Sequence, residues 1–242
     1  MALLIPSIDL MGGKIVQLVQ GKKKALEFEN FDEWLERFSQ YPLVQLIDLD
    51  AAIGTGDNRG LIEHFVKRLP CQVGGGIRSI ETARKILDLG AKRVILGSTL
   101  VQEERINTAF AEEIAAELGS DGLVFALDAK SGKVAIRGWR EVTSITPLAM
   151  MEALEPWCAA FLYTHIDTEG MMLGIPIETV RSLRAATKKQ FIAAGGISTN
   201  EEIEKLDAMG IDAVVGMALY LGKIDLLKTG MSENKAATVR EP

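Results

Sequence analysis

Two aspartates stand at matching positions in the two halves of this 242-residue chain. Asp9 follows the apolar run 3–8 and Asp128 follows the apolar run 123–127, so the two acids are 119 residues apart. Two carboxyl groups that face one pocket can transfer protons, one as a base and the other as an acid. An aspartate after a strand more often only closes a turn. The repeated pair nevertheless favours a catalytic role.

Glycine turns recur with almost the same spacing and indicate anion sites. Residues 73–79 (VGGGIRS) return as 193–199 (AAGGIST), and residues 96–98 (LGS) return as 215–217 (VGM). Glycine lets backbone N–H groups approach a ligand closely, and phosphate commonly binds at such turns. A single glycine pair more often marks a tight turn, but two symmetric pairs predict a substrate with a phosphate at each end. The predicted phosphate-binding residues are Gly76, Gly97, Ser98, Gly196, Gly216 and Met217.

Short apolar runs alternate with amphipathic segments along the chain. The expected strands are 3–8, 43–48, 71–73, 93–96, 123–127, 160–163, 191–193 and 213–215. Most are continuously apolar, as strands covered on both faces require. Thr146 before Pro147, and Thr199 before Glu202, are helix start signals. The alternation predicts an α/β fold, a (β/α)8 TIM barrel made of two repeat-related half-barrels. An open doubly wound sheet is the alternative, and the half-chain repeat favours the barrel.

Length and composition favour one enzyme domain. The chain is close to the roughly 250 residues typical of such a barrel, so we expect a barrel over 1–228, with half-barrels at about 1–120 and 121–228, and a polar tail over 229–242. A net charge of −6 argues against nucleic acid as a partner. We expect no targeting segment, and no apolar run of the sequence is long enough to span a membrane. We expect a cytoplasmic monomer without cofactor or metal.

The two cysteines, Cys71 and Cys158, are far apart and lack metal-ligand spacing. Both sit where strands are expected, so we predict buried, inert thiols in a reducing compartment.

The chain resembles the phosphoribosylformimino-aminoimidazole-carboxamide ribotide isomerase family of histidine biosynthesis over almost its whole length. The resemblance lies in residues 5–10 (IPSIDL), Gly13, 19–21 (VQG), 73–79, 93–98, 127–128 with Gly132, 138–139 (GW), 163–164 (YT) with Ile166 and Gly170, 194–197 (AGGI) and 216–220 (GMALY). It implies an intramolecular aldose–ketose isomerase acting on an aminoaldose ribonucleotide with two phosphates. This Amadori rearrangement opens a ribose ring, gives an aminoketose and needs neither metal nor cofactor.

The resemblance also implies roles for single residues. Asp9 would be the base at the carbon that enolises, and Asp128 the acid at the ring oxygen. Thr164 would orient the substrate or Asp128, or be only a β-branched strand residue. Trp139 would fold over the pocket and stack on the imidazole, or only anchor its loop. Arg78 would lie near one phosphate, or form a surface salt bridge.

The sequence departs from the family pattern at five positions. Gln17 stands where the family usually has arginine, and Lys22 where it has an acid. After the sixth expected strand, His165 and Thr168 replace an aspartate and an arginine. Glu169 replaces the aspartate that contacts the reacting ribose, and its side chain is one methylene longer. The basic run 22–24 either compensates for the lost arginine or is simply solvated.

These departures keep related functions open. One is the imidazole-glycerol-phosphate cyclase subunit, although that relative usually opens with Cys-Leu-Asp, whereas this chain has Ile-Asp-Leu at 8–10. Another is a noncatalytic or altered-specificity barrel that binds a phosphorylated ligand. An isomerase that also accepts phosphoribosylanthranilate is a further alternative, because both reactions share one sugar chemistry.

Overall fold

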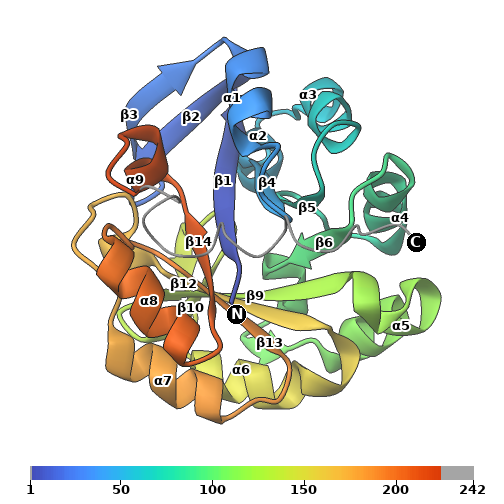
Figure 1. Ribbon diagram of the computed structural model, residues 1–242. Coiled ribbons are helices and arrows are strands. Elements are labelled where there is room, and N and C mark those ends of the chain that lie inside the picture. The colour runs from blue at the N-terminus through green and yellow to red at the C-terminus, as the bar shows by residue number, and fades with distance from the viewer. Residues whose placement is uncertain (1, 225–242) are drawn as a thin grey trace, which may run out of the picture.

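Eight parallel strands close into a barrel in the computed structural model, which describes residues 2–224 (Figure 1). They are β1 (Leu4–Met11), β4 (Val44–Asp48), β5 (Cys71–Gly74), β6 (Arg93–Leu96), β9 (Leu123–Lys130), β12 (Ala160–His165), β13 (Gln190–Ala194) and β14 (Asp212–Val215). Pairing of β6 with β9 and of β14 with β1 closes the ring. The predicted TIM barrel is confirmed. The tail expected over 229–242 lies outside the described residues.

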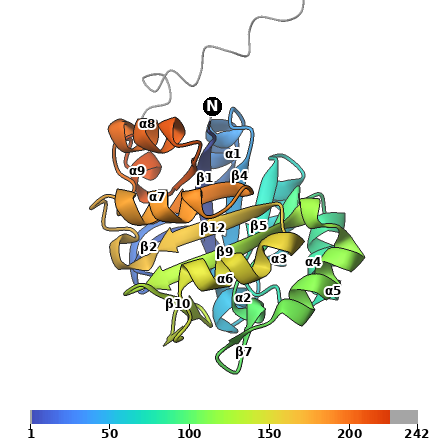
Figure 2. The same ribbon diagram turned by 90° about the horizontal axis from the view of Figure 1, so that it is seen from below.

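Helices cover the outside of this barrel, as α6 and α7 do over β9 and β12 (Figure 2). The helices are α1 (Phe31–Phe38), α2 (Leu49–Ile53), α3 (Arg59–Val66), α4 (Ile80–Asp88), α5 (Thr108–Leu118), α6 (Pro147–Leu154), α7 (Ile177–Ala185), α8 (Asn200–Ala208) and α9 (Met217–Tyr220), with 3-10 turns η1 (Ser98–Leu100), η2 (Ser120–Gly122), η3 (Glu155–Trp157) and η4 (Ile166–Thr168). Both predicted start signals are confirmed: Thr146 caps α6, and Thr199 with Glu202 forms a complete capping box on α8.

Antiparallel hairpins extend β1 and β9 beyond their aspartates. These additional strands are β2 (Lys14–Val19), β3 (Lys23–Phe28), β10 (Lys133–Ile136) and β11 (Glu141–Val142), and a separate small pair is formed by β7 (Val101–Gln102) and β8 (Arg105–Ile106). The strand expected over 123–127 therefore extends beyond Asp128. The chain continues as strand to Lys130, turns at residues 131–132 and folds back as β10.

Alternate positions of the strands fill the barrel interior with apolar side chains. The interior cluster contains Ile5, Leu43, Ile95, Val124, Ala126, Ala160, Leu162, Ile192, Ala194 and Val214, whereas a larger cluster packs between strands and helices. Successive side chains of a strand point to opposite faces. Asp9 and Asp128 share the inward positions of Ile5 and Val124, so both carboxyl groups point into the barrel.

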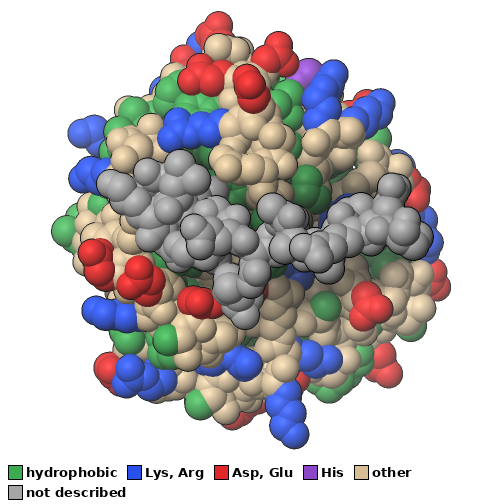
Figure 3. Space-filling view, in the orientation of Figure 1, with side chains coloured by type: hydrophobic (Ala, Val, Ile, Leu, Met, Phe, Trp, Pro, Cys, Tyr) green, Lys and Arg blue, Asp and Glu red, His purple; other side chains and the backbone are tan. Residues whose placement is uncertain are grey.

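Both cysteines are buried and free, and burial raises the pKa of each thiol to about 12, as expected of inert thiols. Cys71 begins β5, but Cys158 lies just before β12 rather than in a strand. Basic and acidic side chains are interspersed on the face shown in Figure 3. Within residues 2–224, no helix combines the length and the apolar character needed to cross a bilayer.

Candidate functional site

A cavity of about 770 Å³ opens where the barrel strands end at their carboxyl termini. All the residues predicted from the sequence to form the site line this cavity, namely Asp9, Gly76, Arg78, Gly97, Ser98, Asp128, Trp139, Thr164, Glu169, Gly196, Gly216 and Met217. Residues that are far apart in the sequence therefore meet in one place. This end of the strands is where TIM barrels carry their chemistry.

The repeat is visible in the strands that carry the two aspartates. Strands β1 and β9 each have eight residues and show the same succession of five buried, one half-buried, one buried and one half-buried position. Asp9 and Asp128 occupy the sixth position of their strands. The two carboxyl groups are thus placed by equivalent backbone and differ only in what surrounds them.

The glycine turns after β5 and β13 are also equivalent. Residues 75–76 have φ of +98° and +68°, and residues 195–196 have φ of +108° and +82°. A Cβ atom at the first glycine would lie 2.2 Å from the carbonyl oxygen of Asp48, and in the second turn 2.4 Å from that of His165. Only glycine fits either turn, because the backbone of the neighbouring strand passes too close for a side chain.

The turns after β6 and β14 leave helix N-termini without side-chain caps. Gly97 and Gly216 precede η1 and α9 in similar conformations (φ −127°, ψ −91° and φ −106°, ψ −100°), and neither helix has a side-chain cap. By contrast, α4 and α8 after the other two turns are capped by Ser79 and Thr199. Backbone N–H groups beside the cavity therefore remain available to an anion on both sides of the barrel.

The turns after β5 and β6 together form what we call the first anion turn, and those after β13 and β14 form the second. Ser98 and Arg78 belong to the first anion turn. The Ser98 hydroxyl accepts a hydrogen bond from the Arg137 backbone N–H at 2.7 Å, which leaves its own proton free to donate to a ligand. Arg78 is exposed at the cavity wall and donates to the Ala52 carbonyl oxygen at 3.0 Å. Among residues 2–224 it forms no ion pair. The predicted alternative of a surface salt bridge is therefore absent from the described part of the chain.

Asp9 sits at the floor of the cavity beside Ser7. Its carboxyl group accepts a hydrogen bond from the Ser7 hydroxyl at 3.2 Å. Burial raises the pKa of Asp9 to about 6, and the hydrogen bond from Ser7 opposes that rise. A carboxyl group with this pKa is ionised at neutral pH but is far more basic than an exposed aspartate, as a general base should be.

Asp128 is held by two donors that Asp9 lacks. The Trp139 indole Nε1–H donates to Asp128 Oδ2 at 2.8 Å, and the Thr164 hydroxyl makes a further hydrogen bond to the carboxyl group. Burial raises the pKa of Asp128, and both hydrogen bonds lower it. The indole ring also packs over Gly21, where a Cβ atom would lie 2.7 Å from Cε3. Trp139 therefore joins the β10–β11 loop to the β2–β3 hairpin above the cavity.

Glu169 adds a third carboxyl group to the same cavity. Burial, together with the nearby charges of Asp9 and Asp128, raises its pKa to about 8. The Glu169 carbonyl oxygen accepts a hydrogen bond from the Gln20 N–H at 2.9 Å, so its loop is tied to the β2–β3 hairpin. With a pKa of about 8, Glu169 keeps its proton at neutral pH.

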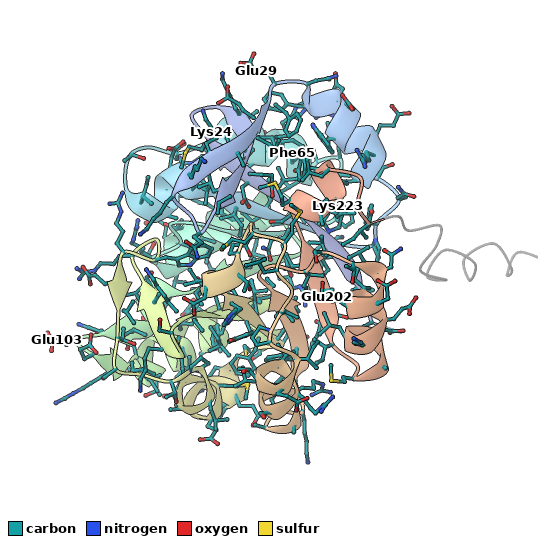
Figure 4. All side chains as sticks on the ribbon, turned by 90° about the vertical axis from the view of Figure 1, so that its left-hand side faces the viewer. Lys24, Glu29, Phe65, Glu103, Glu202 and Lys223 are labelled. Carbon is teal, nitrogen blue, oxygen red and sulfur yellow. The ribbon has the colours of Figure 1, made fainter. Side chains whose placement is uncertain are left out.

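The remaining departures from the family pattern surround the second anion turn and the cavity mouth. Gln17 is buried, its Oε1 lies 2.5 Å from the position of a Cβ atom on Gly216, and its Nε2 has no hydrogen-bond partner among residues 2–224. Lys22 lines the cavity mouth, on the same hairpin as Lys24, which Figure 4 shows together with Glu29. The Lys24 ammonium group pairs with Glu27.

Two of these departures, Thr168 and His165, do not line the cavity. The Thr168 hydroxyl donates to the Gly195 carbonyl oxygen at 3.1 Å and so braces the second glycine turn. The His165 Nδ1 lies 3.2 Å from the Tyr163 hydroxyl, and neither residue lines the cavity. Sequence reasoning missed Ser7, Gln45 and Lys130, which do line it. For Ser7 and Gln45 the available signal was a polar residue at an inward position of an apolar strand.

Comparison with known proteins agrees with this geometry. The sequence pattern of the histidine biosynthesis protein family matches residues 3–225. A protein of Methanocaldococcus jannaschii named 1-(5-phosphoribosyl)-5-((5-phosphoribosylamino)methylideneamino) imidazole-4-carboxamide isomerase is 40% identical over 235 residues, covering 93% of this chain and 97% of the relative. Proteins of the same name from Methanothermococcus thermolithotrophicus and Methanosphaera stadtmanae are 39% and 34% identical, each covering 93% of this chain and 96% of the relative. The chain belongs to the histidine biosynthesis protein family.

Proposed function

We propose that this protein is the aldose–ketose isomerase of histidine biosynthesis that converts the two-phosphate aminoaldose ribonucleotide ProFAR into the aminoketose PRFAR. The names of its relatives support this activity. The observation that carries the proposal is the pairing of two anion turns, after β5–β6 and after β13–β14, around one cavity that holds three carboxyl groups. A substrate with a phosphate at each end would span the cavity and bring its middle to the carboxyl groups.

The reaction consists of ring opening, enolisation and ketonisation, and each of these stages moves protons. An acid protonates the ribose ring oxygen while its bond to the anomeric carbon breaks, which leaves an iminium ion. A base then removes the proton from the adjacent carbon, and the resulting enaminol tautomerises to the aminoketose. Substrate and product are isomers, so protons are only moved, and one acid and one base are sufficient.

We assign the base to Asp9 and favour Glu169 over Asp128 as the acid. Asp9 is ionised at neutral pH, because burial brings its pKa only to about 6. Glu169 still carries its proton, because its pKa is raised to about 8. Burial raises the pKa of Asp128, but the hydrogen bonds that it accepts from Trp139 and Thr164 oppose this rise, whereas Glu169 has no such donors among residues 2–224. In its ionised form Asp128 also raises the pKa of Glu169.

The test of the function is an assay of the purified full-length protein with the aminoaldose ribonucleotide, with the product identified by mass spectrometry and NMR. Phosphoribosylanthranilate is offered in a parallel reaction. Conversion of the aminoaldose supports the proposal, and conversion of both substrates identifies a bifunctional isomerase. Turnover of phosphoribosylanthranilate alone would mean altered specificity, for which the neutral Gln17 beside Gly216 would be the first candidate cause. Binding without turnover of either would favour a noncatalytic barrel.

The dependence of kcat/KM on pH is expected to be bell-shaped. Activity should fall as pH drops through about 6, because the base Asp9 becomes protonated. It should also fall as pH rises through about 8, because the acid Glu169 loses its proton. The profile of kcat/KM reports on groups of the free enzyme, so initial rates at low substrate concentration between pH 5 and about 9 measure both limbs. A flat profile across this range would contradict both assignments.

Both anion turns are expected to bind inorganic phosphate or sulfate. A crystal grown with either ion should show density beside Gly76 and Gly97 and beside Gly196 and Gly216, because uncapped N–H groups face the cavity at both places. The apo crystal grown without such ions serves as the control. If saturating phosphate fills only one turn, a substrate with a single phosphate would fit the site better.

We further propose that the protein acts as a cytoplasmic monomer without nucleic acid or membrane as partner. One chain supplies all three carboxyl groups and both anion turns, so the cavity needs no second subunit. The two free, buried cysteines suit a reducing compartment. Light scattering coupled to gel filtration tests the oligomeric state.

A further inference from the structure

Three polar side chains form a row inside the barrel, directly below Asp9. Ser7 on β1, Gln45 on β4 and Gln72 on β5 are partners in the strand register, so they lie at one level of the sheet. All three are buried, with 7%, 6% and 0% of their surface exposed. Buried amides are uncommon in a barrel interior that is otherwise filled with apolar residues.

Hydrogen bonds connect this row in one direction. Gln72 Nε2 donates to Gln45 Oε1 at 2.9 Å, Gln45 Nε2 donates to Ser7 Oγ at 3.4 Å, and Ser7 Oγ donates to Asp9 Oδ1 at 3.2 Å. The Gln45 amide occupies the acceptor side of the Ser7 hydroxyl, so the Ser7 proton points to the carboxyl group. Bonds that align in this way polarise one another and strengthen the last donor.

The second half of the barrel has no such row. The equivalent partners in register are Ala126 on β9, Leu162 on β12 and Ile192 on β13, all buried and apolar. The fold therefore closes with apolar residues at these three positions. The row also has an energetic cost, because Gln72 Oε1 is buried without a hydrogen-bond partner in the described part of the chain. A polar row that the fold does not need, and that ends on one of two symmetric carboxyl groups, points to a function at that group.

We propose that Gln45 and Gln72, acting through Ser7, are positioning residues that hold Asp9 ionised and correctly oriented as the proton acceptor. The proposal rests on the proposed isomerase function for its kinetic consequences. It explains how a duplicated half-barrel distinguishes its two aspartates. Asp9 accepts a hydrogen bond from Ser7 at the end of the polar row, whereas Asp128 accepts hydrogen bonds from Trp139 and Thr164.

Other charged and titratable groups also surround Asp9. Glu169 faces it from the loop after β12, and Tyr220 faces it from α9. Asp128 and the lysines Lys22 and Lys24 line the same cavity. At the far end of the row, Arg93 is in register with Gln72, but its guanidinium donates to Gln190 Oε1 at 2.6 Å instead. The group at the end of the row that donates to Asp9 is therefore neutral rather than positively charged.

The test replaces the three polar residues of the row with the apolar residues found at the equivalent positions of the second half-barrel. Ser7→Ala, Gln45→Leu and Gln72→Ile each introduce the residue found at the equivalent position, so the barrel has a precedent for tolerating them. Loss of the donors should raise the pKa of Asp9 and move the acidic limb of the kcat/KM profile to higher pH. We expect a roughly three- to tenfold loss of kcat/KM at pH 6, little loss at pH 8, and a decreasing effect from Ser7 to Gln72.

Two further variants control for packing. Ile192→Val changes the same level under the other aspartate and should leave the acidic limb in place. Ser7→Thr keeps the hydroxyl group, so the acidic limb of its kcat/KM profile should lie at the same pH as in the wild type. If Gln45→Leu does not fold, the comparison of Ser7→Ala with Ser7→Thr still decides the result. An unshifted acidic limb in Ser7→Ala would overturn the proposal.

A readout without substrate separates this inference from the proposed function. Carboxyl 13C NMR of the unliganded protein follows the titration of Asp9, which Asp9→Asn identifies by the loss of its signal. A higher pKa in Ser7→Ala and Gln45→Leu would support the row even if the protein fails to turn over the aminoaldose. An unchanged titration of Asp9 in both variants would overturn the row even if the protein proves to be the isomerase.

Discussion

Asp9→Asn is expected to lower kcat by roughly 10²- to 10⁴-fold, the usual contribution of a general base. Asparagine has nearly the shape of aspartate, so substrate binding and the barrel should survive. Its amide cannot accept a proton at neutral pH, however, and the carbon proton of the substrate would have no acceptor. Steady-state kinetics with the aminoaldose measures kcat and KM separately, and circular dichroism checks the fold. A fall in kcat with little change in KM is the expected pattern.

Asp88→Asn is the matched control for this substitution. Asp88 is exposed in the last turn of α4, and the same chemical change there should leave kcat unchanged. If Asp9→Asn retains kcat within a few fold of the wild type, Asp9 is not the base. The cavity would then hold the substrate in a different orientation from the one proposed.

The sequence was sufficient to predict the barrel and the outline of the site because both depend on local patterns. Continuous apolar runs located the strands, and the repeat paired Asp9 with Asp128. The β2 and β10 hairpins were missed although their turns carry a recognisable signal. Gly12-Gly13 separates two apolar runs, and Ser131-Gly132 does the same in the second half, which is typical of short hairpin connections.

The electrostatics of the site could not be predicted from sequence, because it depends on contacts across the barrel. Ser7, Gln45 and Gln72 are single polar residues in three separate strands, and only the register brings them together. Likewise, the raised pKa of Glu169 requires that its loop folds back over both aspartates. In the sequence Glu169 is only a departure from the family pattern, and the reason to propose it as the proton donor comes from these neighbours.

Glu169→Gln is expected to lower kcat by about 10²- to 10⁴-fold if Glu169 is the acid. Glutamine keeps the length and the hydrogen-bonding shape of the side chain but has no proton to give to the ring oxygen. The alkaline limb near pH 8 should disappear from the residual activity, because the group responsible no longer titrates. Asp128→Asn provides the comparison, since it should keep an alkaline limb, moved to lower pH by the loss of a neighbouring charge. Loss of the limb in Asp128→Asn and its retention in Glu169→Gln would return the acid role to Asp128.

The same substitution should change stability in a pH-dependent way. The pKa of Glu169 is raised from 4.5 to about 8 in the folded protein, so folding is favoured while the group is protonated and that stability is lost as pH rises through about 8. Glutamine never ionises, and Glu169→Gln should therefore melt at a higher temperature than the wild type at pH 9 and at nearly the same temperature at pH 4.5. Each kcal/mol of relieved repulsion corresponds to roughly 2–4 °C for a chain of this size. Equal melting temperatures at pH 9 would mean that Glu169 ionises without cost in the folded state, and it could then not be the protonated group on which the proposed ring opening depends.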